Sequence, residues 1–298
     1  MSGERWAFIG LGAMGAPMAR RLLGGPGKLA VFDPVTARSA ELAAAGAVAA
    51  ATAAEAAQQA DVLFLMVVDE AQCRQALLGP DGAAAALAPG SIVVLMSTVG
   101  PEAVHRLAAA LSEVEVELVD APVSGGVARA AAGDLLIMAS GQPAALGRAR
   151  LALDLMGSTV VVCGPTAGNG QSVKLVNQLL CGVHIAAAGE ALAYARALGL
   201  DPAVVHETIR HGAAGSFMLD DRGSRMLGRE FGTVNSALDI FVKDLGLVTS
   251  AAAAQRFPAT LASTANQLFL MGTALGYGGD DDSGILRVFE QWTAPPQP

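Results

Sequence analysis

The chain is predicted to be an α/β protein, with a doubly wound sheet in its first half and helices in its second half. In the first half, short apolar runs alternate with Ala-rich stretches of helical length, which is the order of a doubly wound sheet. After Gly164 the strand-like runs stop and the helical stretches continue. The 298 residues exceed one ordinary core and fit two domains. We therefore expect domains at residues 1–164 and 165–298, joined through a long helix.

Seven apolar runs in the first half are strand candidates. Most are continuous rather than alternating, which indicates strands covered by helices on both faces. The candidate strands are Trp6–Gly10, Leu29–Asp33, Val62–Val68, Ile92–Ser97, Val116–Val119, Leu135–Ala139 and Thr159–Cys163. The helices expected between them are Ala16–Leu23, Ala37–Ala45, Ala71–Leu78, Glu102–Leu111 and Ala144–Leu155.

The second half is predicted to be helical throughout. Gly168–Leu198 has the pattern of a single helix that ends at Gly199, and a mean helix is only about a third as long. A helix of that length usually crosses the centre of a domain or lies between subunits. The further helices expected are Pro202–His211, Phe217–Leu227, Ala237–Ala254 and Leu261–Leu275.

Composition argues against several classes of function. Acidic residues outnumber basic ones, 27 to 19, and no stretch concentrates Lys and Arg, so nucleic acid is not expected as a partner. We see no signal-peptide layout and expect no membrane-spanning segment. The three cysteines match no disulfide pattern, and no His, Cys or carboxylate cluster has metal-ligand spacing. We expect a cytoplasmic protein whose reaction needs no metal.

A glycine-rich turn follows the first candidate strand and opens the first candidate helix. It fits G-x-G-x-x-G, the dinucleotide-binding pattern of a Rossmann domain. The first glycine permits the tight turn, the second lets a pyrophosphate approach the backbone, and the third lets the helix pack closely on the strand. The helix N-terminus then directs N–H groups at the phosphates. The cofactor-binding residues expected here are Gly10, Leu11, Gly12, Ala13, Met14 and Gly15.

Asp33 ends the second candidate strand, eighteen residues after the glycine-rich turn. Rossmann domains place an acid about 20 residues after their glycines, where it bonds the ribose 2′-hydroxyl. A carboxylate there repels the 2′-phosphate of NADP, so NAD is expected as cofactor rather than NADP. Arg38 is near enough in the sequence to bind a phosphate, which weakens that preference. A turn-forming Asp before Pro34 is the alternative interpretation.

Four segments occur in the order found in one known family. They are the glycine-rich turn, D-A-P-V-S-G-G at Asp120–Gly126, G-N-G-Q-S-V-K at Gly168–Lys174, and K-D-L at Lys243–Leu245. Through them nearly the whole chain resembles the β-hydroxyacid dehydrogenase family, in its 3-hydroxyisobutyrate dehydrogenase-like branch. The resemblance implies an NAD-binding Rossmann domain and an all-α domain of the 6-phosphogluconate dehydrogenase type. It implies that the second domain binds substrate and forms the contacts of a homodimer or homotetramer.

The resemblance also implies roles for individual residues. Lys174 would be the catalytic residue, and Lys243 would lie near the cofactor. Ser124, Gly125 and Gly126 would hold the substrate carboxylate. Asn177 occupies a position where the family has Asn or His, and Gln178 replaces the usual Asn. Both amides would contact the substrate.

A lysine suits the oxidation of an alcohol. The nicotinamide carries the hydride, and the protein handles the proton. Burial lowers the pKa of a lysine, which can then accept the hydroxyl proton, and its charged form polarises a carbonyl in the reverse direction. Lys174 is the only lysine between Lys28 and Lys243 and lies about one turn into the long helix. A lysine that reaches the surface from an Ala-rich helix is the alternative.

Several stretches are similar to a subgroup that acts on threonate-like sugar acids: residues 178–187, 239–248 and 276–283. We therefore expect a small anionic hydroxy acid or sugar acid as substrate. The alternatives are dehydrogenases of the 3-hydroxyisobutyrate or tartronate semialdehyde (2-hydroxy-3-oxopropionate) type. An imine reductase and a non-catalytic cofactor-binding module are further alternatives, which an intact Lys174 argues against.

Two side chains outside these segments are further candidates. Thr98 directly follows the fourth candidate strand, at the edge where open α/β sheets bind ligands, and is expected near the nicotinamide. A helix N-cap before Pro101 fits Thr98 equally well. Phe217 is expected either to form a wall of the substrate pocket or to lie in the core. Among the histidines, His206 is expected at the surface or at a helix cap.

Overall fold

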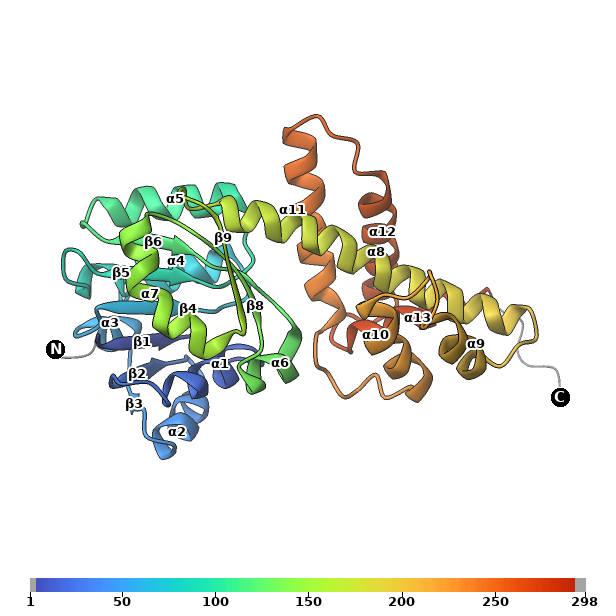
Figure 1. Ribbon diagram of the computed structural model, residues 1–298, viewed down its shortest axis with the longest axis horizontal. Helices are drawn as coiled ribbons and strands as arrows, with labels where there is room; N and C mark the ends of the chain where they lie inside the picture. The colour runs from blue at the N-terminus through green and yellow to red at the C-terminus, as the bar shows by residue number, and fades with distance from the viewer. Residues whose placement is uncertain (1–3, 293–298) are drawn as a thin grey trace. The chain divides into compact units, whose positions relative to one another are not determined.

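The computed structural model describes residues 4–292, which form two compact units that divide between Lys174 and Leu175 (Figure 1). The first unit holds a sheet covered by helices, and the second is built from helices. This is the predicted combination of an α/β domain and an all-α domain, so the predicted fold class is confirmed. The domain limits expected at residues 164 and 165 stay a prediction.

The sheet of the first unit has nine strands among the described residues. Their order is β3-β2-β1-β4-β5-β6-β8-β7, with β9 paired to β8. All neighbours from β3 to β6 are parallel, in the order of a Rossmann domain. Strand β8 is antiparallel to β6 and β7 and parallel to β9. The bounds are β1 (Trp6–Ile9), β2 (Leu29–Phe32), β3 (Val48–Ala49), β4 (Val62–Leu65), β5 (Ile92–Leu95), β6 (Glu117–Asp120), β7 (Val123–Ser124), β8 (Leu136–Ser140) and β9 (Thr159–Gly164).

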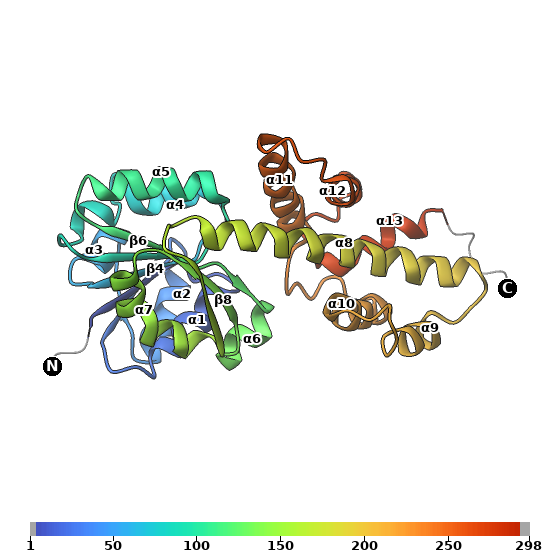
Figure 2. The ribbon, with the colours of Figure 1, turned by 45° about the horizontal axis from the view of Figure 1, so that its top comes forward.

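Helices cover both faces of this sheet (Figures 1 and 2). Successive side chains of a strand point to opposite faces, so Trp6 and Phe8 enter one core while Ala7 and Ile9 enter the other. The first core is closed by α1 (Gly15–Leu22), α2 (Thr36–Ala44), α6 (Gly126–Ala132) and α7 (Pro143–Met156). The second is closed by α3 (Ala53–Ala57), α4 (Glu70–Leu78), η1 (Ala84–Ala86) and α5 (Pro101–Ser112).

The segment after β6 continues the sheet instead of leaving it as a loop. Asp120 in β6 lies opposite Ser140 in β8, and Ser124 in β7 lies opposite Leu136 in the same β8. The two pairings share one antiparallel register, which β6 and β7 keep across the interruption at Pro122. The register therefore fixes how Asp120 and Ser124 are spaced along β8.

The second unit contains most of α8 and the five α-helices after it. Its core includes Phe241 of α11 and Phe269 of α12, whose stacked rings have centroids 5.3 Å apart. Buried Asp282 binds Arg222 of α10 through two hydrogen bonds, which ties η2 to that helix. The bounds are α8 (Asn169–Ala197), α9 (Pro202–Ile209), α10 (Phe217–Gly228), α11 (Leu238–Ala254), α12 (Thr260–Ala274), η2 (Asp282–Ile285) and α13 (Leu286–Glu290).

The predicted long helix is confirmed as α8, which Figure 2 shows as one uninterrupted helix of 29 residues. Among the described helices it alone is long and apolar enough to cross a membrane, contrary to the expectation that no segment would be. The most apolar window of α8 is 44% buried inside the protein. Because the core helix of a soluble protein passes the same test, this is weak evidence for a membrane span.

Candidate active site

The glycine-rich turn after β1 has the geometry of a dinucleotide cradle. Gly10 has φ +91°, and a Cβ there would lie 2.2 Å from the Met66 carbonyl oxygen. A Cβ at Gly15 would lie 1.9 Å from the Gly10 oxygen, whereas one at Gly12 would meet nothing within 4 Å. The outer glycines are therefore required by the fold, and Gly12 faces open space. No side chain caps α1 at Met14, so its N-terminus can direct N–H groups at a phosphate.

Asp33 is buried at the end of β2 and holds the turn in place. Its Oδ2 accepts a hydrogen bond from the Leu11 N–H at 2.7 Å, and its Oδ1 accepts one from the Val35 N–H at 2.8 Å. The second contact is the turn predicted as an alternative, so Asp33 does form a turn. Arg38 also pairs with this carboxylate, Nη1 to Oδ1, at 3.2 Å.

Thr98 lies just beyond β5 and is partly buried. The N-cap position of α5 is Gly100, with φ +84° and Pro101 as the first helical residue. Thr98 is therefore not the residue that caps this helix. Its predicted contact with the nicotinamide stays a prediction.

The segment Ser124–Gly126 connects β7 to α6. Gly125 and Gly126 both have positive φ, +140° and +75°. A Cβ at Gly126 would meet nothing within 4 Å, and Gly126 is exposed. A short helix starts at once after Gly125, where only a turn was expected. The backbone at Gly126 is accessible to a ligand, and its binding of a carboxylate stays a prediction.

Asp120 connects the sheet to the start of α8. Its Oδ2 accepts hydrogen bonds from the N–H groups of Gly168 and Gln171, at 3.1 and 2.8 Å, and from the Ser140 hydroxyl at 3.2 Å. Its Oδ1 accepts one from Gln171 Nε2 at 2.9 Å. Burial raises the pKa of Asp120, and the hydrogen bonds from Gln171, Ser140 and Gly168 act against that rise.

Lys174 is the last residue of the first unit and is only 6% exposed. It follows Gln171 by one helical turn, so both side chains lie on the same side of α8. The alternative in which Lys174 reaches the surface is therefore wrong. Buried ammonium groups in proteins are paired or functional, so the burial of Lys174 is compatible with a catalytic role, and that role stays a prediction.

Four predicted or neighbouring polar residues meet in the second unit. Asn177 Nδ2 donates to Gln178 Oε1 at 2.8 Å, and Gln178 Nε2 donates to Asp244 Oδ2. Lys243 Nζ forms an ion pair with Asp244 Oδ1 at 2.7 Å. The structure thus brings Asn177, Gln178 and Lys243 together through one buried carboxylate that had no predicted role. Substrate contact by the two amides stays a prediction.

Two expectations about the second unit need correction. Phe217 is 56% exposed at the start of α10, so its assignment to the core is wrong and a place in the pocket wall stays a prediction. His206 is 4% exposed, not at the surface. Its Nε2 lies 2.9 Å from the Leu219 carbonyl oxygen, and this polar contact accounts for its burial.

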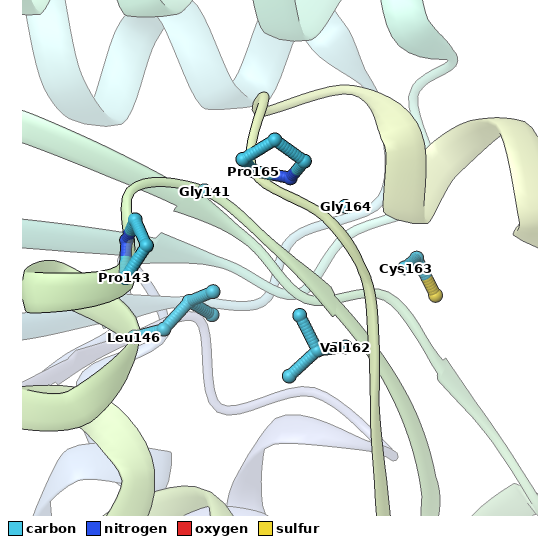
Figure 3. A pocket seen from close by; sticks show the side chains of 7 residues that line it. All are labelled: Gly141, Pro143, Leu146, Val162, Cys163, Gly164 and Pro165. Carbon is cyan, nitrogen blue, oxygen red and sulfur yellow. The ribbon is translucent and has the colours of Figure 1, made fainter.

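A surface pocket of about 470 Å³ lies at the turn before α7 and at the end of β9 (Figure 3). Burial raises the pKa of the Cys163 thiol beside it, and a raised pKa makes a thiol less reactive. None of the predicted site residues lines this pocket. The lining residues are Gly141, Pro143, Leu146, Val162, Cys163, Gly164 and Pro165.

Three polar residues of the site had no predicted role: Asp120, Gln171 and Asp244. Each stands inside a segment that carried the family resemblance. Asp120 also ends a strand. An acidic residue at the end of an apolar strand was the one feature of the sequence that could have indicated a role for it. Its main partner, Gln171, is 51 residues away, and single-sequence patterns do not pair residues over that distance.

Both halves of the chain match families of known proteins. Residues 5–164 match the family described as the NAD binding domain of 6-phosphogluconate dehydrogenase. Residues 168–289 match the family described as NAD-binding of NADP-dependent 3-hydroxyisobutyrate dehydrogenase. Two successive dehydrogenase domains therefore span nearly the whole chain.

Individual relatives agree with the family models. L-threonate dehydrogenase from Cupriavidus necator is 41% identical over 281 residues, 94% of both proteins. The enzyme of the same name from Escherichia coli K12 is 40% identical over 239 residues, 80% of this chain and 79% of that protein. The crystal structure of 3-hydroxyisobutyrate dehydrogenase from Salmonella typhimurium has 42% identity and a TM-score of 0.90, covering 96% of this chain and 99% of that one.

A Rossmann sheet with an open glycine cradle, followed by a helical dehydrogenase domain, defines a nicotinamide-dependent oxidoreductase. More particularly, the chain belongs to the β-hydroxyacid dehydrogenase family, in the branch of 3-hydroxyisobutyrate dehydrogenase-like enzymes. It is an NAD(P)-dependent dehydrogenase of that type, as the sequence resemblance implied.

Proposed function

We propose that this enzyme oxidises a hydroxyl of L-threonate, or of a closely similar sugar acid, with NAD as cofactor and Lys174 as the acid–base group. The observation that carries the proposal is the burial of Lys174 on the first turns of α8. Relatives named L-threonate dehydrogenase, matched over most of the chain, support the substrate.

The residues present fit a nicotinamide dinucleotide. Gly12 leaves open space over the turn, the N-terminus of α1 has no side-chain cap, and Asp33 directly follows β2. We propose that these groups hold the pyrophosphate and the adenosine ribose, with Leu11, Ala13 and Met14 forming the turn. Thr98 and Lys243 would contact the nicotinamide half. The bound cofactor supplies the hydride acceptor.

In the proposed mechanism Lys174 moves the proton. Its neutral Nζ accepts the hydroxyl proton as the neighbouring C–H bond breaks, and the two electrons of that bond leave with hydrogen as hydride. The C–O bond becomes a carbonyl, and Lys174 returns its proton to water. In the reverse direction the charged Nζ donates that proton to the forming hydroxyl.

The remaining proposed residues orient a small anion. Ser124, the half-buried Gly125 and the exposed Gly126 would hold the substrate carboxylate, because successive N–H groups at positive φ suit an anion. Asn177 uses its Nδ2 within the protein, so its Oδ1 can accept a bond from a substrate hydroxyl. Gln178 and Phe217 would complete the pocket.

A 3-hydroxyisobutyrate-type activity is the second candidate. It is favoured by one observation, the 42% identity to the structure named 3-hydroxyisobutyrate dehydrogenase. The two candidates share the proton-transfer group and the carboxylate site, and they differ in the hydroxyls that the pocket must accept.

We further propose a homodimer or homotetramer located in the cytoplasm, with residues 165–298 forming the substrate and oligomer domain. The net charge of −8 supports the absence of nucleic-acid partners. The relatives named as dehydrogenases support a soluble protein rather than a membrane-bound one.

The test is a panel of hydroxy acids with NAD or NADP, followed through the absorbance of the reduced cofactor. The panel holds L-threonate, 3-hydroxyisobutyrate, glycerate, tartronate and 4-hydroxybutyrate, and kcat/KM should be highest for L-threonate with NAD. Lys174→Ala should lower kcat by about 10²–10⁴-fold, while the exposed control Lys28→Ala should leave it unchanged. Near-normal turnover by Lys174→Ala would remove Lys174 from the mechanism.

A further inference from the structure

Gln171 is a fully buried amide whose orientation is fixed by its partners. Its Oε1 accepts hydrogen bonds from the N–H groups of Val99 and Gly100, at 2.9 and 3.0 Å. Its Nε2 donates to the Ser97 carbonyl and to Asp120 Oδ1, both at 2.9 Å. A backbone N–H can only donate and a carbonyl can only accept. The amide therefore cannot be flipped without breaking three or more bonds.

Asp120, the last residue of β6, binds the first turn of α8, to which Gln171 belongs. It accepts the N–H groups of Gly168 and Gln171, which belong to the N-terminal groups that a helix leaves without an internal partner. The Gly170 N–H goes to the Ser140 hydroxyl at 2.9 Å. A Cβ at Gly170 would lie 2.3 Å from the Met138 carbonyl oxygen. The first turn of α8 is thus packed directly against the ends of β6 and β8.

The side chain of Gln171 connects two parts of the proposed site, the first turns of α8 and the segment after β5. Gln171 precedes Lys174 by one helical turn, and Cβ atoms at this spacing are about 5–6 Å apart. Through Oε1 the same side chain holds Val99 and Gly100, which follow Thr98. We propose that Gln171 and Asp120 are positioning residues, which set the place of Lys174 and of the segment after β5 for proton transfer. This inference rests on the role proposed for Lys174.

Two nearly isosteric substitutions test the arrangement. Gln171→Glu places an oxygen against the Ser97 carbonyl and Asp120 Oδ1, while Asp120→Asn places an N–H group against Gln171 Nε2. In Asp120→Asn, rotating Gln171 does not relieve the conflict, because the N–H groups of Val99 and Gly100 require an acceptor. Rotating the new amide at position 120 does not relieve it either, because the N–H groups of Gly168 and Gln171 require an acceptor there. With L-threonate and NAD at saturation, we expect each variant to lower kcat by about tenfold or more, since small displacements of reacting groups are costly. The dissociation constant of NADH should stay within about threefold, because the glycine cradle is untouched.

The double variant is the decisive measurement. Asp120→Asn combined with Gln171→Glu restores one donor facing one acceptor between positions 120 and 171. We expect kcat to recover to within about fivefold of the wild-type value, with the Ser97 carbonyl still facing an oxygen. The exposed control Gln142→Glu makes the same chemical change elsewhere in the first unit and should leave kcat unchanged.

Melting temperatures of all variants show whether each one folds. If a single variant does not fold, Ser140→Ala replaces it, because it removes one donor to Asp120 and the acceptor of the Gly170 N–H. It should lower kcat by about threefold, and an unchanged kcat would overturn the proposal. So would single variants of normal kcat, or a double variant no better than the worse single. Lys174→Ala is assayed in parallel. If Lys174→Ala keeps its activity, the proposed function is wrong. If Lys174→Ala is inactive while the Gln171 and Asp120 variants have normal kcat, only this inference is wrong.

Discussion

Asp33 has one structural role that is observed and one binding role that is proposed. Its carboxylate binds the Leu11 N–H of the glycine turn and is also expected to receive the ribose of the cofactor. Arg38 pairs with the same carboxylate from a position where its own side chain is 48% exposed. The Arg38 guanidinium can turn away from this pair into water, and the buried Asp33 carboxylate then keeps its hydrogen bonds from the N–H groups of Leu11 and Val35. Arg38 can therefore serve a cofactor that brings its own phosphate.

This leads to a prediction about cofactor choice. Arg38→Gln should lower kcat/KM with NADP by about tenfold, the value of one lost charged hydrogen bond to a phosphate. The value with NAD should change by less than about threefold, because Asp33 keeps its two backbone contacts. Initial rates with both cofactors give the ratio. Arg20→Gln, on the exposed Arg20–Glu41 pair, is the control. Equal losses with both cofactors would mean that Arg38 only supports Asp33.

At the residue scale, sequence patterns predicted groups whose role is local. Gly10, Gly12 and Gly15 follow a known spacing, and their backbone environment in the structure agrees with it. Gln171 and Asp120 were missed as a pair, because their bond depends on how a helix start docks on a strand end. Hydrophobic periodicity carries no information about such a contact. The only signal was that both residues lie in segments that resemble the family, Asp120–Gly126 and Gly168–Lys174.

At the scale of elements, hydrophobic runs predicted the long strands and helices well. The seven predicted strands and five predicted helices of the first unit are present, because each has enough residues to show a pattern. The two-residue strands β3 and β7 and the short helices α3 and α6 were not predicted. A stretch as short as Val48–Ala49 carries no period, and its strand exists through pairing with β2.

Charged residues at the ends of strands form ion pairs that connect neighbouring strands. Arg5, just before β1, binds Asp61, just before β4, at 2.8 Å from Nη2 to Oδ1. The Arg5 N–H donates to the same carboxylate. The side-chain hydrogen bond from Arg5 lowers the pKa of Asp61, against the opposing effect of its partial burial. The folded state therefore binds the proton of this carboxyl less tightly than the unfolded chain does.

From this shift we expect a pH-dependent loss of stability. A carboxyl with a lowered folded-state pKa stabilises the fold above its ordinary pKa, and this contribution disappears as pH falls through the folded-state pKa. Asp61→Asn should thus cost about 0.5–1 kcal/mol at pH 7, and the difference from the wild type should shrink below about pH 4. Urea unfolding at a series of pH values measures it, with the exposed Asp81→Asn as control. A difference that stays constant down to pH 3 would contradict the assignment.

At the scale of the whole molecule, the order of motifs along the chain identified the family and with it the two-part architecture. The substrate is not fixed in this way, because specificity depends on the shape of a pocket and not on the spacing of its residues. Net charge acts at this scale too. A net charge of −8 disfavours the approach of anions in general, so the proposed anionic substrate would have to be bound through local N–H groups and placed cations such as Lys174.

The second unit carries apolar side chains that a folded monomer would leave in water. Tyr194 of α8 is 62% exposed and Trp292 is 66% exposed. With Phe289 they line a hollow of about 580 Å³ on this unit. Clustered apolar surface of this kind usually marks an interface, and homo-oligomers bury such surface through symmetric contacts. The proposed homodimer or homotetramer would use this face.

We therefore expect a solution mass of two or four times 30.0 kDa, measured by light scattering behind a sizing column. Tyr194→Asp should shift the mass towards that of the monomer at micromolar concentration, because a charge buried at an interface costs several kcal/mol. Leu151→Asp is the matched control, since Leu151 is 53% exposed on the first unit, and its mass should not change. A wild-type mass of 30.0 kDa would refute the oligomer. An unchanged mass for Tyr194→Asp would move the interface to another face, because a carboxylate at position 194 is tolerated only where water still reaches it.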